Sequence, residues 1–98
     1  MKQLLINNKK ELEKFCKKNQ IKFFGVFGSF ARGEEGKNSD IDIIIDFITP
    51  KSLMEIGGIQ YELTETLGRP VDIVSRKNIK PAIKDNILKD VKVLYGKK

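Results

Sequence analysis

The sequence has no histidine, no tryptophan and a single cysteine in 98 residues. Without histidine, the chain lacks Ser-His and Cys-His nucleophilic pairs and histidine-ligated zinc. Cys16 alone cannot form an internal disulfide, and its helical spacing from Leu12 predicts a buried thiol. Carboxylates are therefore the groups left for acid–base chemistry or metal binding, and we expect any catalysis to be metal-assisted.

Long hydrophobic runs are also lacking. The uninterrupted apolar runs are only a few residues long, far shorter than a membrane span requires. The apolar segment Leu4–Ile6 is followed at once by Asn7, which does not resemble a secretory signal. We therefore expect a cytoplasmic location and one domain over residues 1–98, because this length suits a single hydrophobic core.

The charge is positive but not concentrated. The chain carries 19 Lys and Arg against 13 Asp and Glu, a formal net charge of +6. The lysines are spread along the sequence, and the aromatic residues do not alternate with them as stacking platforms for bases would. We interpret these lysines as solvated helix surface and expect no direct binding to nucleic acid or membrane.

Helical and strand patterns alternate along the chain. Asn8 and Glu11 are typical of a helix start, and Asn19 is expected to end that helix in a left-handed conformation. Thr49 and Pro50 indicate the start of a second helix, which Gly68 ends. The remaining elements are expected as strands at 21–27, 40–47, 71–74 and 91–95 and a last helix at about 79–88. This order predicts an α/β (α+β) fold, with a mixed sheet of about four strands and helices mainly on one face.

The segment 40–47 has a clear two-residue period. Four apolar residues face one way and three acidic residues face the other beside Ile44. The two sets are Ile41, Ile43, Ile45 and Phe47, and Asp40, Asp42 and Asp46. We expect one face in the core and the other as an acidic surface. Elsewhere, Gly57 and Gly58 inside the second helix predict a close packing contact or a local weakness.

A glycine turn and separated carboxylates form the strongest candidate site. Gly28 and Ser29 follow an apolar strand, where backbone N–H groups can bind phosphate, and Arg32 could hold a phosphate oxygen. Asp40 and Asp42 lie about 6.6 Å apart on one strand face. Two carboxylates so placed can bridge a pair of metal ions, and Asp72 would join them if its strand is a neighbour. Magnesium suits carboxylates combined with substrate phosphates.

Each of these features alone has an ordinary explanation. Gly-Ser is commonly just a turn, Arg32 could be a surface residue, and single aspartates on strands keep an exposed face soluble. Their combination in one short chain is what favours a site for a metal ion and a nucleoside triphosphate.

These residues together resemble the nucleotidyltransferase fold of the DNA polymerase beta superfamily, whose signature is Gly-Ser, a spacer and Asp-x-Asp in an apolar strand. More narrowly, three segments resemble the minimal nucleotidyltransferases that act as antitoxins to HEPN-domain toxins. These segments are GVFGSFARGEEGKNSDIDIIIDF, LGRPVDIV and IKPAIKDNILKDVKVLYG. The resemblance covers almost the whole chain and implies a single minimal nucleotidyltransferase domain.

The resemblance also implies an activity. AMP would pass from ATP to a hydroxyl, a tyrosine of a partner HEPN toxin, with two Mg²⁺ ions assisting. Gly28, Ser29 and Arg32 would hold the nucleotide, while Asp40, Asp42 and Asp72 would bind metal and catalyse transfer. An alternative is a binding module that neutralises its partner by occlusion, through apolar residues of the last helix and strand: Ile83, Ile87, Leu88, Val93 and Leu94. A third, weaker interpretation is nucleotide addition to an RNA end, which predicts salt-sensitive RNA binding.

Overall fold

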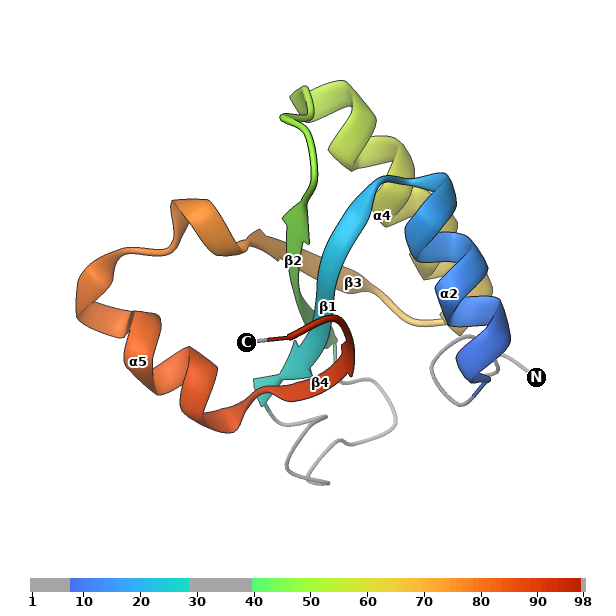
Figure 1. Cartoon of the computed structure of the whole chain (residues 1–98). Helices are drawn as coiled ribbons and strands as arrows, with labels where there is room; N and C mark the ends of the chain where they lie inside the picture. The colour runs from blue at the N-terminus through green and yellow to red at the C-terminus, as the bar shows by residue number, and fades with distance from the viewer. Residues whose placement is uncertain (1–7, 29–39, 98) are drawn as a thin grey trace.

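The computed structural model describes residues 8–28 and 40–97 (Figure 1). Within these ranges it has three α-helices, one short 3-10 helix and four strands. In chain order they are α2 (Lys9–Lys18), β1 (Ile21–Phe27), β2 (Ile41–Phe47), α4 (Leu53–Leu67), β3 (Val71–Ser75), η1 (Arg76–Asn78), α5 (Pro81–Asp90) and β4 (Lys92–Tyr95). None of these helices combines the length and hydrophobicity of a membrane span.

The strands form one mixed sheet in the order β3-β2-β1-β4. β1 is antiparallel to both β2 and β4, whereas β2 and β3 are parallel. Figure 1 shows α2 and α4 together on one side of this sheet and α5 on the other. The predicted fold class is confirmed, including the four-stranded mixed sheet with helices mainly on one face.

The larger core lies between the sheet and helices α2 and α4. The four apolar residues that alternate along β2 all face it, as predicted. Phe15 of α2 meets Phe24 of β1 edge-on, with ring centroids 6.3 Å apart. The buried members are Leu12, Phe15, Cys16, Ile21, Phe24, Val26, Ile41, Ile43, Ile45, Phe47, Ile59, Leu63, Leu67 and Val71.

The second sheet face differs from the prediction. It carries a smaller buried cluster of Phe23, Ile44, Ile79 and Val91, against which parts of α5 pack. Asp46, expected on an open acidic surface, is only 7% exposed. The expectation of an acidic surface along all of β2 is therefore wrong, because the chain after β3 folds back over the far end of this face.

Two helix ends also differ from the prediction. Asn19 has a φ of −101°, and it is Gln20, the next residue, that adopts the left-handed conformation with a φ of 57°. Helix α4 begins at Leu53 and not at Pro50, because Ser52 and Glu55 form a capping box. The Ser52 backbone N–H donates to Glu55 and holds the pKa of that carboxyl below its ordinary value. Gly68 ends the helix with a φ of 71°, as predicted.

The two glycines inside α4 make no close packing contact with the residues that the structure describes. A Cβ built at Gly57 or Gly58 meets nothing within 4 Å. The expectation of a close contact there is therefore wrong. Since glycine weakens a helix by about 1 kcal/mol relative to alanine, the other expectation, a locally weak helix, stays a prediction.

Cys16 is buried, and burial raises its pKa to about 12. Because the thiolate is the reactive form, we expect Cys16 in the folded protein to resist alkylation by iodoacetamide at about pH 8. In denaturant the same thiol should react promptly, and intact-protein mass spectrometry would follow both reactions. Equal rates in the two conditions would contradict the buried position.

Candidate functional site

Three adjacent strands place two carboxylates side by side at one end of the sheet. Asp42 of β2 lies opposite Asp72 of β3, and Phe27, the last residue of β1, lies opposite Asp42 from the other side. Paired residues of neighbouring strands are about 4.8 Å apart and project from the same face. The condition set by the sequence, that the strand of Asp72 neighbours the strand of Asp42, is confirmed.

The turn after β1 reaches the same point. Gly28 has a φ of 71°, which disfavours residues with a side chain. A Cβ at this position would also collide with Oδ2 of Asp42. The glycine therefore brings the backbone directly against the Asp42 carboxylate, as a phosphate-binding turn beside a carboxylate requires.

The three predicted acidic residues differ in exposure. Asp42 is half-buried, whereas Asp72 is exposed, and Asp40 is exposed immediately before β2 begins. Two other predicted nucleotide-binding residues, Ser29 and Arg32, lie outside the described residues. The described part of the site is thus an exposed acidic corner next to a glycine turn.

The donor set suits a metal ion that arrives with a substrate. Within residues 8–28 and 40–97, no three acidic or cysteine side chains gather closely enough to hold a metal by themselves. Asp42 and Asp72 nevertheless offer two carboxylates from adjacent strands. Mg²⁺ is commonly held by one or two carboxylates, with water and substrate phosphates completing its octahedron, so these residues fit it.

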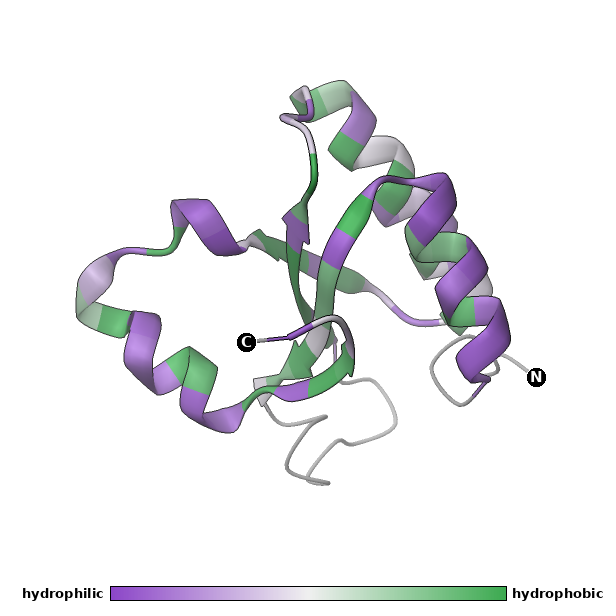
Figure 2. Cartoon of the chain, viewed as in Figure 1, coloured by the Kyte–Doolittle hydropathy of each residue, from purple (hydrophilic) through white to green (hydrophobic). Residues whose placement is uncertain are grey.

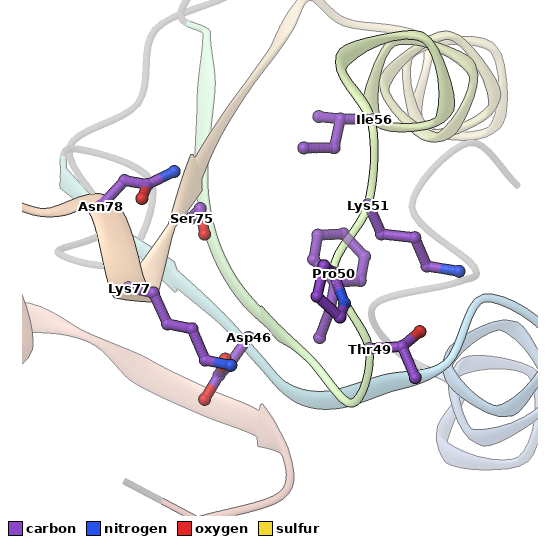
Figure 3. A pocket seen from close by; sticks show the side chains of 9 residues that line it. Asp46, Thr49, Pro50, Lys51, Ile56, Ser75, Lys77 and Asn78 are labelled. Carbon is purple, nitrogen blue, oxygen red and sulfur yellow. The ribbon is translucent and has the colours of Figure 1, made fainter.

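A separate polar pocket of about 190 Å³ lies at the opposite ends of β2 and β3 (Figure 3). Its lining residues are Asp46, Phe47, Thr49, Pro50, Lys51, Ile56, Ser75, Lys77 and Asn78. Oδ1 of Asp46 has no hydrogen-bond partner among the described residues, and Oδ2 lies 3.7 Å from Nζ of Lys22. Along an extended strand, Asp46 is about 13 Å from Asp42, so the pocket is distinct from the acidic corner.

Sequence reasoning missed this pocket. The two-residue period placed Asp46 on the correct face but could not show that η1 covers that end of the strand. Phe23 of β1 is paired with Asp46, and Lys22 is the residue before Phe23. Only the register between β1 and β2 reveals their contact.

The apolar residues suggested for partner binding are divided between core and surface. Ile83 and Val93 are 48% and 36% exposed. Ile87 and Leu88 pack against the smaller core cluster, and Leu94 packs against the larger one. These five residues therefore do not form one free docking face.

The chain is similar in sequence to known proteins. A family model described as polymerase beta nucleotidyltransferase matches residues 10–98. A Methanocaldococcus jannaschii protein that is named a protein adenylyltransferase is 42% identical over 73 residues, 74% of this chain and 78% of its own. The protein adenylyltransferase MntA of Thermococcus cleftensis is 37% identical over 89 residues, 90% of this chain and 86% of its own.

Solved structures share the fold. One, described as a minimal nucleotidyltransferase, matches with a TM-score of 0.75 and 27% identity and covers 93% of each chain. Another contains tri-AMPylated Shewanella oneidensis HEPN toxin in complex with MNT antitoxin. It matches with a TM-score of 0.70 and 21% identity, over 99% of this chain and 74% of the other.

Proposed function

Because this chain belongs to the polymerase beta nucleotidyltransferase family, we propose that it transfers AMP from ATP to a hydroxyl of a partner protein. The acceptor is a tyrosine of a HEPN-domain toxin, and the chain acts as the antitoxin. The observation that carries this proposal is the pairing of Asp42 with Asp72 beside the turn at Gly28. Two acid groups and a glycine turn lying together support nucleotidyl transfer, because such a turn can bind phosphate and carboxylates can hold metal.

The residues have distinct roles in the proposed reaction. Backbone at Gly28, with Ser29 and Arg32 after it, holds the triphosphate. Asp40, Asp42 and Asp72 hold two Mg²⁺ ions, which neutralise charge on the phosphates when bound. The acceptor oxygen forms a bond to the α-phosphorus. The bond between the α-phosphorus and the oxygen that bridges to the β-phosphate breaks, and pyrophosphate leaves with its electron pair. Asp72, exposed on the edge strand β3, either holds the metal that activates the acceptor hydroxyl or itself takes the acceptor proton.

The names of similar proteins support the choice of nucleotide and partner. Two relatives, 42% and 37% identical over the residues that match this chain, are named protein adenylyltransferases, which favours AMP and a protein acceptor. The Shewanella oneidensis complex pairs an MNT antitoxin with an AMPylated HEPN toxin, which favours a HEPN partner for this chain.

The test is incubation of the purified chain with ATP labelled at the α-phosphate, Mg²⁺ and the protein encoded by the adjoining gene. We expect label on a tyrosine of that protein, and none when EDTA removes the metal. Neutralisation of the partner without any label would instead support occlusion. Label on added RNA, with binding that weakens as salt is raised, would support the RNA interpretation.

A further inference from the structure

Helix α4 carries large apolar side chains on the side away from the core. Leu53, Met54 and Tyr61 are 88%, 87% and 69% exposed. The buried residues of the same helix, Ile59, Leu63 and Leu67, lie on its opposite side, in the larger core cluster. In Figure 2, α2 is drawn mostly hydrophilic, whereas hydrophobic bands run along α4. The outer side of α4 is thus unusually apolar for an exposed helix.

Two glycines lie in the middle of this apolar side. Gly57 and Gly58 follow Met54 at three and four residues and precede Tyr61 by four and three, so all four residues share one face. Beyond the helix's own backbone and the adjoining residues, no described atom lies within 4 Å of a Cβ built at either glycine. Packing within the described chain therefore gives no reason for glycine here, although glycine weakens the helix. We name Leu53, Met54, Gly57, Gly58 and Tyr61 the α4 stripe.

One carboxylate that is unpaired among the described residues, Glu65, lies beside the α4 stripe. Helix α4 contains three glutamates and no lysine or arginine, in a chain with a net charge of +6. Glu55 pairs with Lys51 at 3.7 Å and Glu62 with Lys18 at 3.3 Å. Glu65 is exposed and has no ion-pair partner within residues 8–28 and 40–97. Glu65 lies four residues after Tyr61, next to the stripe.

We propose that the α4 stripe docks an amphipathic helix of a partner protein, with an apolar face flanked by lysines or arginines. The proposal rests on the proposed function in one respect, that the partner is the acceptor protein. Glycines let two helix backbones approach closely, and Met54, Leu53 and Tyr61 supply the apolar contact. Basic residues on the partner would meet Glu65, which steers association.

A nucleic acid and the α2 helix of a second copy both fit the α4 stripe poorly. Phosphates of a nucleic acid would be repelled by Glu65, which lies exposed beside the stripe. The basic helix α2 of a second copy cannot supply an apolar face, because Leu12, Phe15 and Cys16 are buried in its own core.

The glycines provide a test in which folding and binding change in opposite directions. Replacing both glycines, Gly57→Ala and Gly58→Ala, should raise the melting temperature by about 4 °C or more, since alanine favours helix and finds open space. The same variant should bind the adjoining gene's protein about tenfold more weakly, because two methyl groups separate the helices. Thr66→Ala, an exposed position of α4 outside the stripe, is the matched control: it also favours helix but should not alter binding.

Charge gives a second comparison. Glu65→Lys should weaken the complex, and the loss should shrink as salt is raised. Asp85→Lys makes the same charge change at an exposed position of α5 and should leave affinity unchanged. Isothermal titration calorimetry at two salt concentrations would measure both variants.

The outcomes separate docking from catalysis. If the α4 variants bind as tightly as the unaltered chain, the docking proposal is overturned, whether or not the partner is labelled. If they lose binding while the unaltered chain transfers no AMP, docking stands and the proposed function fails. If the two proteins never form a complex, both the docking proposal and the proposed function are overturned. If the chain forms a homodimer that the glycine variant abolishes, the stripe binds a second copy and the proposed partner helix is wrong.

Discussion

Asp42→Asn is expected to lower AMP transfer to the partner by about 10³-fold or more. The change removes the negative charge of Asp42, which lies opposite Asp72, while keeping the shape of the side chain. Metal-assisted stabilisation of phosphate charge contributes several kcal/mol, and each 1.36 kcal/mol lost from it slows the reaction about tenfold. Single-turnover transfer of labelled AMP, with thermal melting to confirm folding, measures the effect.

Asp46→Asn is the matched control for this variant. It makes the same chemical change on the same face of β2, four residues further on, in the separate polar pocket. Its carboxylate has one weak ion pair, with a half-exposed Lys22, and an oxygen that accepts no hydrogen bond from described residues. We expect transfer at the unaltered rate. If Asp42→Asn retains activity, or if both variants lose it equally, the assignment of the site is wrong.

Local chemistry explains which parts of the fold were predictable. The alternation along 41–47 depends only on the strand period, so it assigned Ile41, Ile43 and Ile45 correctly to the larger core. Asn8 and Gly68 cap their helices through contacts within a few residues, and both were predicted at the right positions. The start of α4 was missed because two local signals competed, and the Ser52 capping box prevailed over Pro50.

Features that depend on distant segments could not be read from the sequence. The burial of Asp46 requires η1 to fold over β2. The apolar spacing in α4 assigned Leu63 and Leu67 correctly to the core but wrongly placed Leu53 there, which is 88% exposed. For the candidate site, the spacing of Asp40 and Asp42 follows from the strand period. The position of Asp72 opposite Asp42 depends on the β2–β3 register, which no local pattern specifies.

Gly28→Ala is the second substitution with a large expected effect. An alanine would have to keep a φ of 71°, which lowers the free energy of unfolding by about 1–2 kcal/mol. Its Cβ would also displace Oδ2 of Asp42, so the carboxylate would lose its present position beside the turn. Since a misplacement of about 1 Å at a reacting centre can slow catalysis about 100-fold, we expect at least that loss of AMP transfer.

Gly68→Ala is a control that introduces backbone strain without placing a side chain in the turn at Gly28. Gly68 ends α4 with the same φ of 71°, so alanine there carries the same backbone strain at a helix end. Chemical denaturation should show a similar loss of stability for the two variants, while transfer per folded molecule falls only in Gly28→Ala. Should Gly28→Ala transfer AMP as fast as Gly68→Ala, contact between the turn and Asp42 has no part in the reaction, and the phosphate must bind elsewhere on the sheet.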